Sequence, residues 1–168
     1  MNIMKIKNFN ISNGSGIGVS VYVSGCPLHC PGCFNQEAWD PSAGKEMTRE
    51  NLMFIMSLLA RPEIDHLSVL GGEPLAVWNT SGVRELITEA RKKFPEKKIW
   101  LWTGYMPSEL DETQREIAGM CDYVTYGRYE AEKTDLNRKY SGSSNQFTVR
   151  KDGKVIEEAK TQEEKGND

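Results

Sequence analysis

The chain has 168 residues, of which 38% are hydrophobic and 27% charged, with a formal net charge of −3 at pH 7. This length predicts one domain with a sizeable core, and the acidic balance argues against a nucleic-acid partner. The first residues hold no long apolar run typical of a signal peptide, and no stretch is long enough to cross a bilayer. We therefore expect a cytoplasmic protein with no membrane partner.

Strands and helices are predicted to alternate from residue 18 onward, and no strand is predicted before it. Short runs of β-branched, aliphatic or aromatic residues predict strands, and apolar residues at helical spacing predict helices. In chain order, the expected elements are a strand at 18–24, a helix at 48–60 with Thr48 as N-cap, a strand at 66–70, a helix at 83–94, a strand at 98–102, a weaker helix at 107–120 and a strand at 121–126.

This alternation is typical of an α/β fold with a mainly parallel sheet. About four strand–helix units fit before residue 127 at roughly 30 residues each, whereas a complete eight-stranded barrel needs about 250 residues. We therefore predict a single domain at residues 1–157 whose sheet is open or forms a partial barrel. An Asp152-Gly153 turn predicts a hairpin within 146–157, and the polar residues 158–168 are expected to form a disordered tail.

Three of the four cysteines lie within the eight residues CPLHCPGC, as Cys26, Cys30 and Cys33. A disulfide is disfavoured by the reducing compartment expected above. A structural zinc site takes four protein ligands, and the candidate fourth ligand, His29, sits inside the same tight loop. The remaining interpretation is an iron–sulfur cluster. A four-iron cluster normally takes four thiolates, so three cysteines would leave one iron open for a substrate.

Two further motifs follow predicted strands. Gly71-Gly72-Glu73-Pro74, the GGEP motif, comes after the strand at 66–70, and Thr103-Gly104-Tyr105 comes after the strand at 98–102. Ligands of open α/β sheets bind at the carboxyl ends of the strands. The cysteine loop and these two motifs are therefore expected to converge on one mouth.

The cysteine spacing followed by the aromatic Phe34 resembles the signature of the radical SAM superfamily, and GGEP resembles a second motif of that superfamily. The segments SGCPLHCPGCFNQEAWD, LGGEPL, IWLWTGY and GSSNQ, in this order, are similar to the small activating proteins of anaerobic ribonucleoside-triphosphate reductase, over about residues 11–146. This resemblance implies a partial radical SAM β/α barrel and an oxidoreductase that activates a glycyl-radical enzyme. Such an activase cleaves S-adenosylmethionine reductively to methionine and a 5′-deoxyadenosyl radical, which removes a hydrogen from one glycine of the large reductase subunit.

The same resemblance implies the site. Cys26, Cys30 and Cys33 would ligate a 4Fe–4S cluster, whose open iron takes the amino and carboxylate groups of S-adenosylmethionine. No catalytic residue is implied beyond the cluster and the cofactor. The expected partners are the large reductase subunit and a low-potential electron donor such as flavodoxin or ferredoxin.

Two short segments are implied as the cofactor-binding loops. The backbone of Gly32, Cys33 and Phe34 would face the adenine, although Phe34 could instead be a packed core aromatic. The second segment would face the methionine ammonium, with Gly72 as the better glycine ligand and with the Glu73 carboxylate; its residues are Gly71, Gly72 and Glu73.

The chain departs from the family's pattern at three positions. Tyr126 stands where relatives usually carry an acid, Leu70 where serine is common, and Gly18 where many have an arginine. The fourth cysteine, Cys121, is predicted to be buried and inert. Two other function classes stay open, namely a different radical SAM enzyme, such as a pyruvate formate-lyase activase or a small-molecule modifier, and a non-catalytic zinc-binding module.

Overall fold

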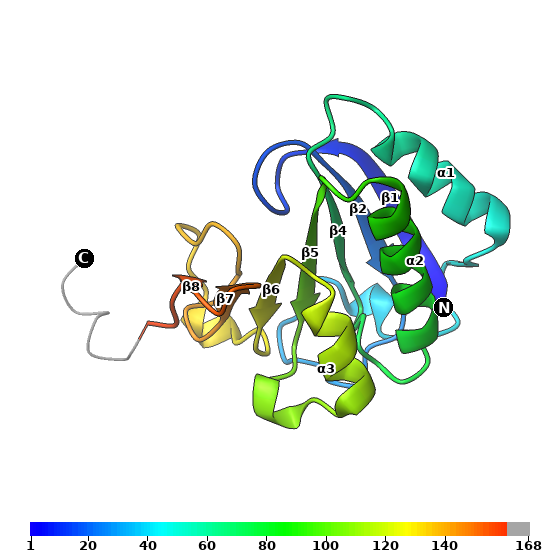
Figure 1. Ribbon diagram of the computed structural model, residues 1–168. Coiled ribbons are helices and arrows are strands. Elements are labelled where there is room, and N and C mark those ends of the chain that lie inside the picture. Colours follow the sequence, from blue (N-terminus) through cyan, green and yellow to red (C-terminus); the bar gives the residue numbers. More distant parts are fainter. Residues whose placement is uncertain (161–168) are drawn as a thin grey trace.

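The structure, a computed structural model, describes residues 1–160. This part of the chain forms one eight-stranded sheet and three α-helices, joined by loops (Figure 1). No helix within it is long and apolar enough to cross a membrane. The strands are β1 (Asn2–Asn10), β2 (Gly18–Val23), β3 (Lys45–Glu46), β4 (His66–Gly71), β5 (Lys98–Thr103), β6 (Tyr123–Tyr126), β7 (Phe147–Arg150) and β8 (Val155–Glu157). The α-helices are α1 (Arg49–Leu59), α2 (Thr80–Lys93) and α3 (Glu112–Gly119), and single 3-10 turns lie at Gln36–Ala38, Pro107–Glu109 and Ala131–Lys133.

The sheet is open, with the strand order β3-β1-β2-β4-β5-β6-β7-β8. Its four central strands, β2, β4, β5 and β6, run parallel, and antiparallel pairs flank them on both sides. The predicted α/β class with a mainly parallel, open sheet is therefore confirmed in its central part.

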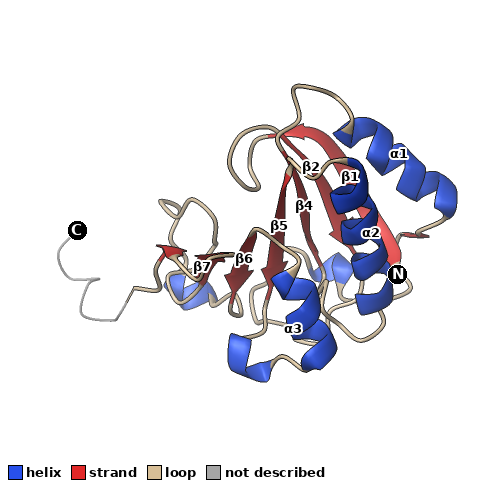
Figure 2. Ribbon diagram, in the orientation of Figure 1, coloured by secondary structure: helices blue, strands red, loops and turns tan. Residues whose placement is uncertain are grey.

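The two faces of the sheet differ because side chains alternate along each strand. Val21, Val69, Leu101 and Val124 lie in register across the four parallel strands and join the core beneath the helices. Figure 2 shows the three helices gathered on this side of the sheet. The neighbouring row, Ser20, Ser68, Trp100 and Tyr123, is polar or aromatic and faces the other way. Loops cover this second face.

One of these loops is residues 11–17, which connect β1 to β2. The backbone oxygen of Asn13 accepts hydrogen bonds from the Ser68 hydroxyl at 3.0 Å and lies 2.5 Å from the Nε2 atom of His66. The side-chain nitrogen Nδ2 of Asn13 donates to the hydroxyl groups of Tyr22 and Ser20 at 2.8 and 3.2 Å. The loop therefore packs over the second face of β2 and β4.

Several predicted boundaries hold. Thr48 caps α1, accepting a hydrogen bond from the Asn51 backbone at 3.2 Å. The hairpin expected within 146–157 is the β7–β8 pair, and Gly153 occupies its turn with φ of 86°, a backbone conformation that favours glycine.

Other predictions differ from the structure. β1 and β3 are unpredicted strands. The helix expected at 107–120 is a 3-10 turn followed by α3, because Asp111 and Gln114 form reciprocal hydrogen bonds that start a new helix. Cys121 precedes β6 rather than beginning it. Residues 158–160 hydrogen-bond to the 135–144 region, whereas residues 161–168 of the predicted tail lie outside the described residues.

Candidate functional site

A cavity of about 380 Å³ opens at the carboxyl ends of the parallel strands, and its volume is within the range of small-molecule sites. The loops after β2, β4, β5 and β6 all contribute to it, together with the 138–146 segment and the loop at 11–17. Its lining includes Asn13, Tyr22, Cys26, Cys30, Cys33, Phe34, Trp39, Gly71, Gly72, Glu73, Trp102, Thr103, Gly104, Tyr129, Tyr140 and Gln146.

The three cysteines of the loop after β2 all line this cavity as free, half-buried thiols. Burial raises the pKa of Cys26 and of Cys30, while backbone N–H groups act in the opposite direction: those of Leu28 and His29 at Cys26 and that of Tyr129 at Cys30. The backbone of Asn35 donates to the Cys33 sulfur at 3.4 Å. A main-chain N–H group therefore approaches each sulfur, but at Cys26 and Cys30 burial outweighs these donors and the pKa of each thiol is raised.

The donor chemistry fits an iron–sulfur cluster. Soft thiolates are its usual ligands, and hydrogen bonds to sulfur tune its potential. Within residues 1–160, no group of three or more His, Cys, Asp and Glu side chains is placed to hold a single metal ion. His29, the candidate fourth ligand of a zinc site, stacks on Trp39 with ring centroids 4.5 Å apart.

The GGEP loop packs against the start of the cysteine loop. A side chain at Gly71 would meet the Val23 backbone at 2.6 Å, and its φ of 117° also favours glycine. A Cβ atom at Gly72 would lie 2.6 Å from the backbone oxygen of Gly25. The Gly72 and Glu73 N–H groups donate to Val23 and Gly25 at 2.7 and 2.8 Å. Glycine at position 72 is therefore favoured by the close approach of the two loops themselves.

Glu73 is the most buried acid of the site, at 1% exposure. One carboxylate oxygen accepts hydrogen bonds from the Leu75 backbone at 2.9 Å and from the Thr103 hydroxyl at 2.8 Å. The other oxygen accepts from the Gly104 backbone at 2.8 Å. Burial raises the pKa of Glu73 to about 7, and these donors limit the rise. The carboxylate thus joins the loops after β4 and β5, with its oxygens already engaged by the protein.

All but one of the predicted site residues line the cavity. The exception is Gly32, which is absent from the cavity lining. An added Cβ atom at Gly32 would lie 2.9 Å from the Cβ atom of Ala131. Phe34 is 88% exposed, so the alternative of a packed core aromatic is wrong. Its ring meets that of Tyr129 edge-on, with centroids 5.8 Å apart.

Sequence analysis misses the part of the cavity formed after β6. Tyr129 belongs to the segment YGRY, and Gln146 ends GSSNQ. The side-chain oxygen of Gln146 accepts hydrogen bonds from the backbones of Gly142 and Ser143, each at 3.0 Å, and its nitrogen donates to Gly127 at 2.9 Å. Both segments are polar and show neither helical nor strand periodicity. The short motifs themselves are therefore the only sequence signal for this part of the cavity.

The three departures from the family pattern lie in different places. Tyr126 packs against the core on the helix side, beside Phe147, and lines a cavity on that face; it is absent from the cysteine cavity's lining. Leu70 does line the cysteine cavity. A side chain at Gly18 would collide with the ring of His66. Cys121 is buried at 1% exposure, and burial raises its pKa to about 12, in keeping with an inert thiol.

The open α/β sheet and the three-thiol cavity define a protein of the iron–sulfur class, and residues 12–149 match the family described as 4Fe-4S single cluster domain. The chain is 35% identical over 152 residues to the anaerobic ribonucleoside-triphosphate reductase-activating protein of Vibrio cholerae, covering 89% of this chain and 98% of that protein. It is 32% identical to the protein of the same name from Escherichia coli K12 over 87% of this chain and 96% of that protein. For the corresponding protein of Enterobacteria phage T4, the identity is 33% over 87% of this chain and 92% of that protein. The chain belongs to the family of anaerobic ribonucleoside-triphosphate reductase-activating proteins.

Proposed function

We propose that the protein is a radical SAM activase that generates a glycyl radical on the large subunit of anaerobic ribonucleoside-triphosphate reductase. The observation that carries this proposal is the placement of three free thiols and the GGEP loop around one cavity at the carboxyl ends of parallel strands. The names of the relatives support the choice of partner.

In this proposal, Cys26, Cys30 and Cys33 hold a 4Fe–4S cluster. When bound, the cluster supplies the electron that cleaves S-adenosylmethionine to methionine and a 5′-deoxyadenosyl radical. Gly32, Cys33 and Phe34 lie on the adenine side, and the loop of Gly71, Gly72 and Glu73 lies on the methionine side. The Glu73 carboxylate accepts three hydrogen bonds, which fix this loop at the cavity.

The open sheet supports a protein substrate. We propose that this sheet is a partial radical SAM barrel. Its parallel strands β2, β4, β5 and β6 do not close into a ring, so the cavity at their ends stays open on one side. Hydrogen abstraction requires near-contact between the attacking carbon and the glycine hydrogen. A loop of the large subunit would enter the opening and complete the enclosure. The electron donor, a flavodoxin or ferredoxin, and a cytoplasmic location belong to the same proposal.

The test combines the reconstituted, reduced protein with the large reductase subunit under anaerobic conditions. We expect an organic radical on the large subunit in electron paramagnetic resonance, with a narrower signal when the partner's glycine is deuterated at the α-carbon. Turnover of a small molecule without a protein radical would favour a different radical SAM enzyme. A colourless zinc protein without iron would favour the interaction module.

A further inference from the structure

The segment 138–142 forms a wall of the cavity, and none of its residues has a role in the function proposed above. All five of its residues, 138 to 142, line the cavity. We refer to this segment as the 138–142 wall. It has no helix or strand of its own, and its backbone is held by hydrogen bonds to the backbone of Asp135 at both ends and by contacts with side chains in between.

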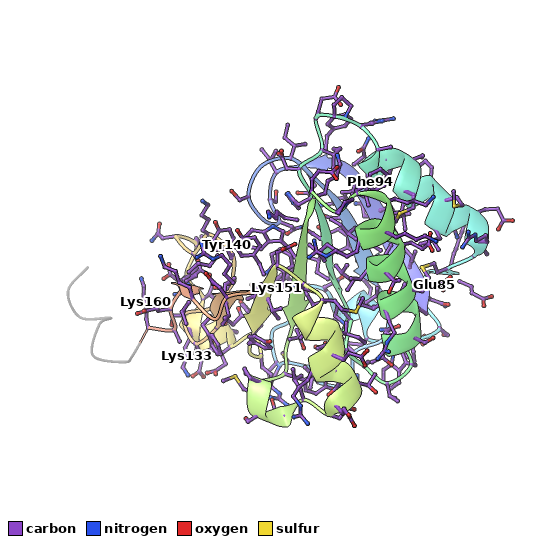
Figure 3. The ribbon with its side chains drawn as sticks, viewed as in Figure 1. Glu85, Phe94, Lys133, Tyr140, Lys151 and Lys160 are labelled. Atoms are coloured by element: carbon purple, nitrogen blue, oxygen red, sulfur yellow. The ribbon has the colours of Figure 1, made fainter. Side chains whose placement is uncertain are left out.

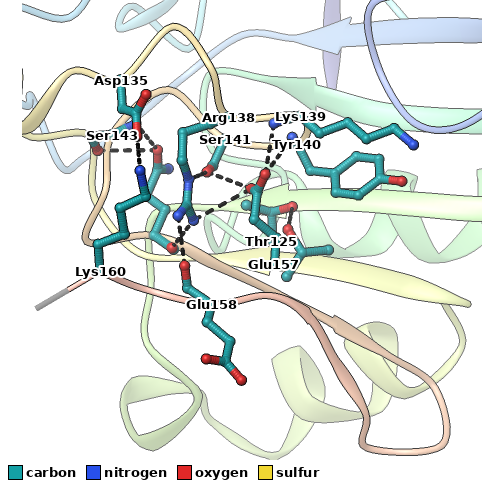
Figure 4. Close-up of polar contacts among 12 residues, drawn as sticks. Thr125, Asp135, Arg138, Lys139, Tyr140, Ser141, Ser143, Glu157, Glu158 and Lys160 are labelled. Atoms are coloured by element: carbon teal, nitrogen blue, oxygen red, sulfur yellow. Dashed lines mark hydrogen bonds and ion pairs between the residues drawn. The ribbon is translucent and has the colours of Figure 1, made fainter. Parts of the chain in front are cut away.

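Most of these contacts come from one acid on the last strand. One carboxylate oxygen of Glu157, in β8, accepts hydrogen bonds from the backbone N–H groups of Lys139 at 2.7 Å and Tyr140 at 3.1 Å. The other oxygen accepts from the Ser141 hydroxyl at 2.6 Å. Figure 4 shows this carboxylate at the centre of the dashed contacts. Three consecutive wall residues are thus bound to a single side chain.

Arg138 closes the network from the other side. Its guanidinium lies 3.5 Å from the Glu157 carboxylate, and it donates to the Ser141 hydroxyl at 2.9 Å and to the backbone oxygen of Gln146 at 2.7 Å. The side chains of Arg138 and Glu157 are 4% and 11% exposed. A buried, fully engaged ion pair of this kind holds a defined geometry, and removing one partner leaves the other charge without compensation.

The wall in turn contacts both the sheet and the cysteine side of the cavity. The indole N–H of Trp102 donates to the backbone oxygen of Tyr140 at 2.6 Å, and the Tyr140 ring lies 4.8 Å from that of Trp100. Figure 3 places Tyr140 at the end of the molecule that carries Lys160, away from Glu85 on α2. A Cβ atom at Gly142 would lie 3.3 Å from the ring of Tyr129, which contacts Phe34. Movement of the wall would therefore reshape the cavity beside Phe34.

We propose that Glu157 is a positioning residue for the small-molecule ligand of this cavity. Its carboxylate fixes the 138–142 wall at the distance from Phe34 and Tyr129 that S-adenosylmethionine requires. The ligand's identity rests on the proposed function, whereas the geometry of the wall does not. The β7–β8 hairpin is accordingly part of the binding site, although it lies after the last predicted site residue in the sequence.

The test compares Glu157→Gln with Glu158→Gln in the reconstituted holoprotein. Both changes remove one carboxylate, but Glu158 is exposed and only its backbone oxygen meets Arg138. Glutamine at 157 can keep one acceptor for the Lys139 and Tyr140 N–H groups and loses the charge facing Arg138. For Glu157→Gln we expect the dissociation constant for S-adenosylmethionine, measured by titration calorimetry, to rise about ten-fold, as the loss of one charge-assisted hydrogen bond predicts.

Iron content should stay at the wild-type level in both variants, and Glu158→Gln should also keep the wild-type affinity for S-adenosylmethionine. Unchanged affinity in Glu157→Gln overturns the inference. Loss of iron together with affinity also overturns it, because the network would then support the fold as a whole rather than the ligand. A wild-type protein that binds no S-adenosylmethionine removes the proposed function and the inference with it.

Discussion

The Thr103 hydroxyl donates a hydrogen bond of 2.8 Å to the buried carboxylate of Glu73, and this contact joins the end of β5 to the loop after β4. The two residues are 30 positions apart in sequence, and their strands are adjacent and parallel. The contact lies at the cavity, where it fixes one loop against the other. The rigidity of the proposed cofactor loop therefore depends on a residue outside its motif.

Replacing Thr103 by valine keeps the shape of the side chain and removes the donor. Because the buried Glu73 carboxylate loses one of its partners, we expect the free energy of unfolding to fall by about 1–3 kcal/mol. Denaturant unfolding of the iron-free protein measures this change. Thr113→Val, at an exposed position of α3, serves as the control and should change stability far less. Equal effects at the two sites would show that the Glu73 contact contributes no net stability.

The raised pKa of Glu73 predicts a specific pH dependence. The folded protein keeps the proton up to about pH 7, whereas the ordinary carboxyl releases it near 4.5. Between these values the folded state binds the extra proton, so stability falls as the pH rises through this window and levels off above it. Glu73→Gln lacks this contribution, which amounts to about 3 kcal/mol at most. Unfolding of both iron-free proteins across the window tests this, and parallel pH curves would contradict it.

Gly72→Ala is expected to disturb the cysteine loop directly. The new methyl group would approach the Gly25 oxygen at 2.6 Å and the Ala38 oxygen at 3.0 Å, so one of the two loops must move. We expect lower stability and weaker iron retention together, measured by thermal unfolding and iron analysis. Gly119→Ala is the matched control, since an added Cβ there meets nothing within 4 Å and alanine is the better helix former. Wild-type stability and iron content in Gly72→Ala would show that the loops tolerate a side chain.

Phe34→Ala should weaken the binding of S-adenosylmethionine while leaving the stability of the fold almost unchanged. Because the side chain is 88% exposed, its loss should change the free energy of unfolding by no more than about 0.5 kcal/mol. Its ring lines the cavity beside Tyr129, so the apparent affinity for S-adenosylmethionine should fall. Leu136→Ala, at a position 93% exposed and absent from the cavity lining, should leave that affinity unchanged. If Phe34→Ala binds like the wild type, the ring does not contact the ligand.

The central fold follows from local sequence patterns. The alternating runs that become β2, β4 and β5, and the apolar stripes of α1 and α2, are strong because one side of each packs into the core. Motifs at strand ends then place Cys26, Gly72 and Glu73 in one cavity by the general rule for parallel sheets. These parts could be predicted without coordinates.

Long-range contacts account for what the sequence could not predict. β1 is a partly exposed flanking strand whose alternation is broken by polar residues, and pairing with β2 and β3 completes it. The 138–142 wall has no periodic signal because Glu157, well beyond it in the chain, orders its backbone. The requirement for glycine at 72 also arises from the distant Gly25 backbone.

The most direct test of the account is the iron and sulfide content of four single cysteine-to-alanine variants after anaerobic reconstitution. The wild type and Cys121→Ala should each hold about four irons and four sulfides per chain, because Cys121 is buried away from the cavity. Cys26→Ala, Cys30→Ala and Cys33→Ala should each fail to hold a stable cluster. Full iron content in Cys30→Ala, or its loss in Cys121→Ala, would contradict the assignment of the three cavity thiols as the cluster ligands.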